Sequence, residues 1–381
     1  MIYLDNSATT RPTSAVGRAV AQAFEEDYFN PSSLYGPALG VEKKLNACRD
    51  KIRGALNAAD AAVIFTSGGT EANNLALTGT VGVSRPPVRI AVSAVEHPSL
   101  FDTAQQLAAE GKCETVVLPV TGAGTVDPEA LKAELSKGLT LLSVMQVNNE
   151  TGAMNDLAEI SRLARSLCPE CRIHVDGVQG FLREKMDFSL ADMYTLSGHK
   201  IHGPKGVGAL VVRKGIRLKP AHTGGGQENA LRSGTENTPG ILGLSAAIDE
   251  MTAMTQRREN MLRVKLTLAE EILRLVPEAV INGPKPEEGA CHILNVSFTG
   301  VRGETMLHAL EEKGVLVSTG SACSSKKRHI SRVLSEMGIN PDTAESAIRF
   351  SLCPYTTREE AVEAARTAAE CHELLKRFKR R

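Results

Sequence analysis

Short apolar runs alternate with helix-like segments along the middle of this 381-residue chain, and this alternation limits the folds it can adopt. The runs are rich in β-branched residues, as buried strands are. We expect strands at Val63–Phe65, Val88–Val92, Thr115–Pro119, Thr140–Val144, Ile173–Val175, Met193–Leu196 and Val207–Val212. We expect helices between them at Glu71–Val81, Ser99–Ala109, Pro128–Ser136 and Asp156–Leu167. This order predicts a mostly parallel sheet with helices on both faces.

The pattern changes after Pro239. Residues 244–276 contain neither glycine nor proline and carry one apolar stripe, which predicts a single long helix that joins two domains. Beyond it we expect strands at His292–Phe298 and Val315–Ser318 and helices at Gly303–Lys313 and Thr357–Phe378. The predicted fold class is therefore α/β. A large domain of residues 13–255 holds a seven-stranded sheet, and a smaller α/β domain comprises residues 256–381 together with residues 1–12.

The composition excludes several classes of protein. The chain has 44 basic and 44 acidic residues, so nothing favours nucleic acid or a strongly charged partner. No apolar run approaches the ~20 residues of a membrane span, and the N-terminus does not read as a signal peptide. We expect a cytoplasmic protein whose eight cysteines are reduced. Cys168 and Cys171 form the one Cys-x-x-Cys pair, which is too little for a structural zinc site and more simply two thiols at a helix end.

A lysine lies in the turn between the last two predicted strands of the sheet, within Ser197-Gly198-His199-Lys200. A lysine held close to a core can lose its charge and form a Schiff base with a carbonyl group. Ser197 and His199 beside it can donate hydrogen bonds to a phosphate. Taken alone, the stretch would more simply be a solvated surface turn, but together with the residues below it indicates pyridoxal 5'-phosphate.

A phosphate cradle is predicted where the strand Val63–Phe65 leads into a helix through Thr66-Ser67-Gly68-Gly69-Thr70-Glu71. Gly69 allows close approach of the backbone, the helix N-terminus presents free N–H groups, and Thr70 adds a hydroxyl. The alternative is a capped strand–helix turn without a ligand. Because the pattern is neither Gly-x-Gly-x-x-Gly nor a Walker loop, a dinucleotide or ATP is disfavoured.

Other polar residues follow predicted strands at the ends where ligands collect in open α/β sheets. Asp176 can keep a pyridine nitrogen protonated, and Gln179 can donate to a phenolic oxygen, although Asp176 would also suit a helix cap. His97 can stack on a cofactor ring and exchange protons, or it is simply a loop histidine. Asn148 follows the strand Thr140–Val144 in the same manner.

Two candidates belong to the smaller domain. Arg349 alternates with apolar neighbours on a predicted strand, and its guanidinium can hold either a substrate carboxylate or a structural carboxylate partner. Cys323 lies in Gly320-Ser321-Ala322-Cys323, which we expect to be an exposed loop, and the basic cluster Lys326–His329 follows it. A thiol beside cations can be a nucleophilic thiolate, whereas a single loop cysteine without this context is usually inert.

Together these motifs resemble the cysteine desulfurases of the aminotransferase class V family, and specifically the group with a long mobile Gly-Ser-Ala-Cys catalytic loop. The resemblance runs nearly from end to end. It is carried by residues 3–10, 30–33, 66–74, 96–97, 146–152, 174–179, 197–206, 232–237 and 320–323. It implies a pyridoxal phosphate enzyme of fold type I, active as a homodimer, that removes sulfur from L-cysteine, releases L-alanine and leaves a persulfide for acceptors in iron–sulfur cluster assembly or tRNA thiolation.

The resemblance also implies a role for each candidate residue. Lys200 would carry the cofactor, and His97 would stack on its ring, which Asp176 and Gln179 would hold. Gly69, Thr70, Ser197 and His199 would surround the phosphate, and Thr235 would reach the phosphate of the other subunit's cofactor. Asn148 and Arg349 would hold the substrate carboxylate, and Cys323 would take the sulfur.

Some positions depart from the family pattern, among them Phe29, Tyr35, Ile330 and the pair Cys353-Pro354. They put the identity of the sulfur acceptor, such as an iron–sulfur scaffold protein, in doubt rather than the chemistry. Two alternatives stay open. One is another reaction of this enzyme class, such as that of a selenocysteine lyase or an aminotransferase. The other is a degenerate subunit that binds partners without catalysis, against which the intact Lys200, Asp176 and Cys323 argue.

Overall fold

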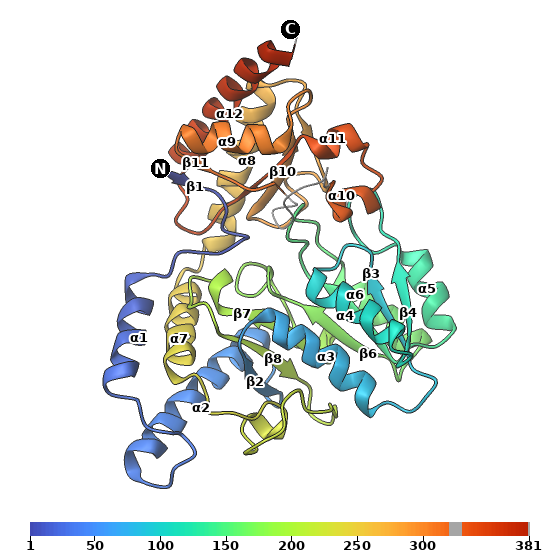
Figure 1. Cartoon of the computed structure of the whole chain (residues 1–381), viewed down its shortest axis with the longest axis vertical. Helices are drawn as coiled ribbons and strands as arrows, with labels where there is room; N and C mark the ends of the chain where they lie inside the picture. The colour runs from blue at the N-terminus through green and yellow to red at the C-terminus, as the bar shows by residue number, and fades with distance from the viewer. Residues whose placement is uncertain (320–329, 380–381) are drawn as a thin grey trace.

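The computed structural model describes residues 1–319 and 330–379. Its larger part is built on a seven-stranded sheet in the order β2-β8-β7-β6-β5-β3-β4 (Figure 1). The strands are β2 (Ala62–Thr66), β3 (Arg89–Ser93), β4 (Glu114–Leu118), β5 (Leu141–Met145), β6 (Arg172–Asp176), β7 (Met193–Ser197) and β8 (Gly208–Val212). Only β8 runs against its neighbours, so the predicted seven-stranded, mostly parallel sheet is confirmed.

Helices cover both faces of this sheet because its strands are apolar on both sides. Within β2, Val63 and Phe65 join one hydrophobic cluster while Ile64 joins the other. Helices α3 (Gly69–Val83) and α4 (Pro98–Ala109) pack on the face of Ile64. The opposite face is covered by α1 (Ser14–Glu25), α2 (Gly36–Leu56), α5 (Pro128–Ser136), α6 (Leu157–Leu167) and α7 (Thr238–Ala253). Short 3₁₀ turns are η1 (Phe188–Leu190), η2 (Gly198–Lys200) and η3 (Glu228–Ala230).

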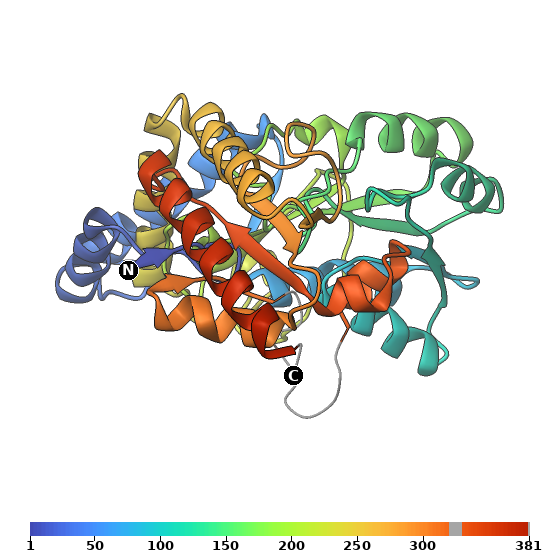
Figure 2. The same cartoon turned by 90° about the horizontal axis from the view of Figure 1, so that it is seen from above.

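The smaller part has its own core and two small sheets. An antiparallel sheet has the order β12-β10-β9, and β1 pairs with β11 in parallel. Helices α8 and α12 lie side by side over the antiparallel sheet (Figure 2). The elements are β1 (Ile2–Tyr3), α8 (Arg257–Leu275), β9 (Val280–Ile281), β10 (Ile293–Ser297), α9 (Gly303–Glu312), β11 (Val315–Leu316), α10 (Arg332–Glu336), α11 (Pro341–Glu345), β12 (Ala347–Ser351) and α12 (Arg358–Lys379).

The N-terminal residues belong physically to this smaller part. Leu4 is completely buried in its hydrophobic cluster, and Ile2 pairs with Val315. The domain boundaries at residues 12 and 255 remain a prediction.

The single long helix expected over residues 244–276 is wrong. Helix α7 ends at Ala253 and α8 begins at Arg257, with Met254 at φ −81° and ψ 78° between them. The Arg257 guanidinium donates to the carbonyls of Met254 and Leu182 and holds the turn. A continuous apolar stripe therefore concealed a change of direction, because each half of it faces a different core.

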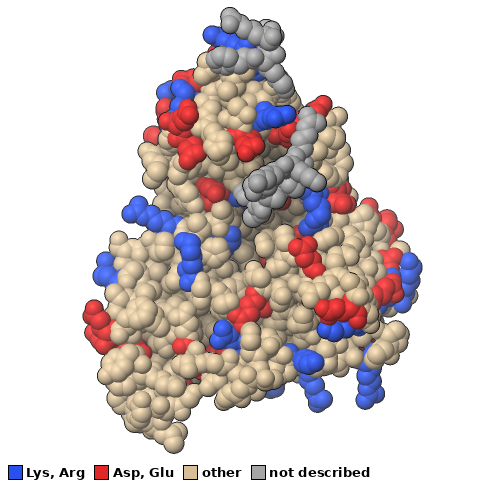
Figure 3. All heavy atoms as spheres, in the orientation of Figure 1, with Lys and Arg blue, Asp and Glu red and all other residues tan. Residues whose placement is uncertain are grey.

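Two surface features bear on function. None of the helices in the described part of the chain is long and apolar enough to cross a membrane. Basic and acidic side chains are interspersed over the face seen in Figure 3, in keeping with a net charge of zero.

Candidate active site

A cavity of about 590 Å³ opens at the carboxyl ends of the central strands, between the large sheet, the N-terminal segment and β12. Nine of the residues predicted from the sequence line it together: Gly69, Thr70, His97, Asp176, Gln179, Ser197, His199, Lys200 and Arg349. They come from both parts of the molecule. The parallel topology explains the meeting of the large-domain residues, because parallel strands bring their carboxyl ends to one edge.

Lys200 ends the η2 turn that follows β7. Its Nζ donates to the carbonyl oxygens of Ser7 at 2.5 Å and Ala8 at 2.8 Å. Burial lowers the pKa of Lys200 to about 7, with a further lowering by the Arg183 and Arg349 guanidinium groups that Asp5 and Asp176 oppose. At neutral pH a large share of this amine is therefore uncharged and nucleophilic.

The wall opposite the small domain fits a phosphate group. The 15-residue helix α3 begins at Gly69 and points its free N–H groups to the cavity end formed by Thr70, Ser197 and His199. The Ser197 Oγ is buried and finds no hydrogen-bond partner among the described residues. A Cβ on Gly69 would lie 2.7 Å from the Val178 Cγ2, so only glycine permits this close packing.

His199 is also positioned to bind a phosphate group. Its Nδ1 lies 3.2 Å from the Thr9 Oγ1. Burial, aided by nearby Lys200, lowers the pKa of His199 to about 4, so the ring is neutral at neutral pH. It can therefore donate one hydrogen bond to an anion without adding charge.

Asp176 ends β6, and both of its carboxylate oxygens are held. Oδ1 accepts from the Val178 N–H at 2.9 Å, and Oδ2 accepts from the Asn73 Nδ2 at 2.8 Å. Asn73 also donates to the Ser99 Oγ at 2.9 Å, so it ties Asp176 to the loop that carries His97. Asn73 received no role from the sequence, although its position one turn after Gly69 on α3 was a usable signal.

His97 caps helix α4 and also lines the cavity. Its Nδ1 accepts the Ser99 backbone N–H at 3.1 Å, which leaves the proton of the neutral ring on Nε2. Burial lowers the pKa of His97, against the opposing effect of Asp176. From the sequence, His97 is either a cofactor-facing residue or a loop histidine; in the structure it caps a helix and also lines the cavity.

Gln179 and Arg349 are held by partners on the cavity wall. The Gln179 Nε2 donates to the Ser7 carbonyl at 2.9 Å, and its Oε1 accepts from the Arg183 Nη1 at 2.8 Å. Arg349 donates to the Asp5 carboxylate at 2.7 Å and to the Asn149 carbonyl at 2.9 Å, while its buried Nε has no partner among the described residues. Arg349 is therefore already in an ion pair, yet it retains a free donor.

The sequence family of the chain follows from a direct comparison. The profile of the family described as Aminotransferase class-V matches residues 2–364. The chain belongs to the aminotransferase class V family. This confirms the resemblance inferred from the motifs, and with it the predicted fold type.

Named relatives within the family are similar over almost their whole length. A cysteine desulfurase of Trichormus azollae is 36% identical over 99% of this chain and 94% of its own. The cysteine desulfurase IscS of Dictyoglomus turgidum is 38% identical over 94% of this chain and 91% of its own. A solved NifS-like protein is 31% identical, has a TM-score of 0.91, and covers 98% of this chain and 100% of its own. The solved structure of a NifS-like protein of Rickettsia africae is 28% identical and has a TM-score of 0.84. It covers 98% of this chain and 99% of its own.

Three predicted residues of this class V chain are not found at the cavity. The Asn148 Oδ1 accepts the backbone N–H groups of Glu150 and Thr151 at 2.9 and 3.0 Å, so this side chain shapes the turn while its neighbour Asn149 lines the cavity. Thr235 is exposed and does not line the cavity of its own chain. Cys323 lies outside the described residues.

Glu96 is a cavity residue that the sequence reasoning passed over. Its side chain is 1% exposed, and Oε1 accepts from the Ser93 Oγ at 2.6 Å and the Met145 N–H at 2.8 Å. Burial, with repulsion from Asp176, raises the pKa of Glu96 to about 8, and Oε2 has no partner within the described chain. The carboxyl group is therefore protonated at neutral pH.

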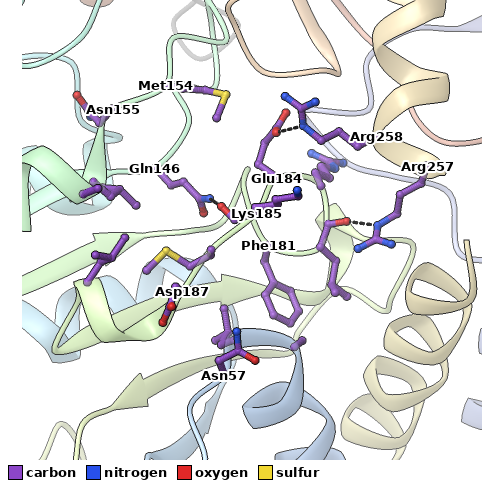
Figure 4. Close-up of a pocket in the computed structure, with 18 of the residues that line it drawn as sticks. Asn57, Gln146, Met154, Asn155, Phe181, Glu184, Lys185, Asp187, Arg257 and Arg258 are labelled. Atoms are coloured by element: carbon purple, nitrogen blue, oxygen red, sulfur yellow. Dashed lines mark hydrogen bonds and ion pairs between the residues drawn. The ribbon is translucent and has the colours of Figure 1, made fainter. Parts of the chain in front are cut away.

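A second cavity, of about 660 Å³, is lined in part by the loop that follows β6 (Figure 4). Its charged side chains are mostly committed to one another or to the backbone: Arg258 pairs with Glu184 at 2.5 Å, and Arg257 donates to the Leu182 carbonyl. Although it is the larger of the two, none of the site residues predicted from the sequence lines it, and we assign the chemistry to the cavity of Lys200.

Proposed function

We propose that this protein is a cysteine desulfurase that works with pyridoxal 5'-phosphate. The observation that carries the proposal is the meeting of Lys200, Asp176 and the phosphate-sized cradle at Gly69 and Ser197 in one cavity. Relatives named cysteine desulfurase are 36–38% identical over nearly the full length, and they favour this activity over others of the family.

The residues of the cavity would hold the cofactor at three points. Lys200 would bind it covalently through the amine that burial keeps reactive. Asp176 would keep the proton on the ring nitrogen, and the Gly69 N-terminus with Ser197 would hold the phosphate. When bound, pyridoxal phosphate supplies an electron sink for the pair released from the substrate Cα–H bond, which no side chain can supply.

The remaining side chains would handle the substrate. Arg349 would hold the carboxylate of L-cysteine, using a guanidinium that Asp5 and the Asn149 carbonyl already orient. Lys200, once released, would take the proton from Cα. His97, neutral with its proton on Nε2, would manage the proton of the substrate thiol.

Sulfur would pass to Cys323. The thiolate attacks the substrate sulfur, an S–S bond forms, and the Cβ–S bond breaks with its electron pair left on carbon. Cβ then gains a proton and Lys200 returns a proton to Cα, so that L-alanine leaves. Thr319 and Ile330, which flank the segment that contains Cys323, both line the cavity.

A homodimer in the cytoplasm completes the proposal. Thr235 is exposed and does not line the cavity of its own chain, which leaves it available to the cofactor of another subunit. A cluster of exposed apolar side chains offers a surface for that second copy: Phe24, Tyr28, Leu34, Tyr35 and Leu39. Acceptors of the persulfide would be proteins of iron–sulfur assembly or tRNA thiolation, including an iron–sulfur scaffold.

The decisive experiment supplies the purified chain with pyridoxal phosphate and L-cysteine and measures alanine, persulfide by mass spectrometry, and the visible band of the cofactor. Cys323→Ser should retain the visible band but lose the persulfide and about 100-fold or more in turnover. Lys200→Ala should lose the band. Cys353→Ser, which removes a partly buried thiol that does not line the cavity, serves as the matched control and should behave as the wild type.

The same assay separates the alternatives. Full persulfide transfer by Cys323→Ser would contradict the role of Cys323. Conversion of an added oxo-acid into its amino acid, without persulfide formation, would indicate an aminotransferase, and turnover of selenocysteine but not cysteine would indicate a selenocysteine lyase. A chain that takes up no cofactor at all would be the degenerate subunit.

A further inference from the structure

Arg183 is a buried cation that the proposed mechanism does not use. It follows β6 by seven residues, its side chain is 2% exposed, and it forms no ion pair with any described carboxylate. Its hydrogen bonds go only to neutral acceptors, namely the Gln179 Oε1 and the carbonyls of Asn6 and Lys200. Burial lowers the pKa of Arg183 only to about 10, so the group stays charged at neutral pH.

An unpaired charge in this position is costly, because a buried ion without a counter-ion loses its hydration without compensation. The Arg183 Nε is also buried and lacks a partner in the described chain. Its three acceptors are all residues at or next to the cavity of Lys200, so the charge lies where it can act on the site.

We propose that Arg183 is a positioning residue of the active site: its guanidinium fixes the amide of Gln179 with Nε2 toward the cavity, and it holds a permanent positive charge behind Lys200. The inference rests on the proposed function, since it concerns how the residues meet the cofactor.

The orientation of Gln179 follows from donors and acceptors alone. A guanidinium can only donate, so the atom that faces Arg183 must be the amide oxygen. The amide nitrogen then faces the Ser7 carbonyl and keeps a second hydrogen for a ligand in the cavity. Without Arg183 the amide could turn and present its oxygen to the phenolic oxygen of the cofactor, which is an unfavourable contact.

The charge acts on Lys200. Among the groups around its amine, Arg183 and Arg349 disfavour the ammonium form, whereas Asp5 and Asp176 favour it and His199 is neutral. Arg349 is paired with Asp5, so much of its field is cancelled. Arg183 has no such partner, and it lies directly against the Lys200 backbone carbonyl.

The first test measures Lys200 in the cofactor-free full chain, through the pH dependence of its reductive methylation followed by peptide mass spectrometry. The midpoint for the wild type should lie near 7. In Arg183→Gln it should rise by about one to two pH units, because a nearby charge has been removed. Arg183→Lys keeps the charge and should keep the midpoint within about half a unit.

Arg257→Gln is the matched control, because Arg257 donates to the Leu182 carbonyl in the same loop but does not touch Gln179 or Lys200. An unchanged midpoint in Arg183→Gln, or an equal rise in Arg257→Gln, would overturn the role of the charge. If Arg183→Gln does not fold, Arg183→Lys still decides, since a rise of more than about one unit in that variant contradicts the proposal.

The second test adds pyridoxal phosphate and titrates the visible band. In Arg183→Lys a single ammonium replaces the two guanidinium nitrogens that contact Gln179 and two carbonyls in a planar fork, so the cofactor affinity should fall about 10-fold while the Lys200 midpoint stays. Wild-type affinity in this variant would overturn the orienting role. A wild-type chain that shows no band would instead refute the proposed function, while the first test would still decide the effect of the Arg183 charge on Lys200.

Discussion

At the scale of single residues, burial shifts the amine, imidazole and carboxyl groups of the site toward their uncharged forms. Lys200 is partly neutral, His199 is neutral, and Glu96 keeps its proton, in each case chiefly through burial. The sequence identified residues whose chemistry is unusual in a turn, such as Lys200. It did not identify Arg183, Glu96 or Asn73, because their importance comes from partners that only the tertiary structure brings close.

Glu96 yields a prediction for the pH dependence of stability. Its pKa rises from the ordinary 4.5 to about 8 on folding, so between these values the folded chain binds a proton that the unfolded chain does not. Stability should therefore fall as pH rises through this window. Glu96→Gln should flatten the dependence and gain about 1 kcal/mol or more at pH 8 relative to the wild type.

The measurement is urea unfolding of the cofactor-free chain at pH 5.5 and pH 8. Glu25→Gln, at an exposed position on α1, should leave the wild-type difference in place. A Glu96→Gln variant that loses as much stability between the two pH values as the wild type would disprove the assignment.

At the scale of elements, the predicted strands Val63–Phe65 to Val207–Val212 all lie in the large sheet, because their apolar residues are buried on both faces. Pro128–Ser136 was predicted with its observed ends, since Asp127 caps it and Pro128 opens it. The prediction of one long helix was wrong because the periodicity shows which side of a helix is buried but not the core against which it packs. The sequence could predict that Gly69 lies in a turn, but not that it packs against Val178.

The close packing at Gly69 predicts a second-site rescue. Gly69→Ala places a Cβ 2.7 Å from the Val178 Cγ2, so α3 must shift away from the cavity and cofactor affinity should fall about 10-fold or more. Val178→Ala removes the clashing methyl group, and the double variant should recover most of the affinity. Titration of the visible band measures both, and a double variant no better than Gly69→Ala would contradict this packing argument.

At the scale of the whole molecule, the cavity exists only where two hydrophobic cores and the N-terminal segment meet. The sequence indicated both cores and the family resemblance implied a dimer, but it could not show that Asp5 pairs with Arg349 or that Ser7 and Ala8 face Lys200. Those contacts join residues more than 190 positions apart, beyond the reach of any local pattern.

The exposed apolar cluster around Leu34 predicts the oligomeric state. Leu34 is 91% exposed and Tyr35 is 52% exposed, which is unusual unless a second copy covers them. Leu34→Asp with Tyr35→Asp should weaken self-association about 10-fold or more, as sedimentation velocity would measure. Leu374→Asp changes an exposed leucine on α12 and is the control. A wild-type chain that is monomeric at micromolar concentration would refute the prediction.

The pairing of Ile2 with Val315 and of Asp5 with Arg349 has a consequence for biosynthesis. The N-terminal segment cannot complete the catalytic pocket until β12 has been made, because Arg349 follows Asp5 by 344 positions. Nascent or prematurely terminated polypeptides that stop before β12 therefore cannot assemble the pocket. Reactive sulfur chemistry can begin only after translation has passed this strand.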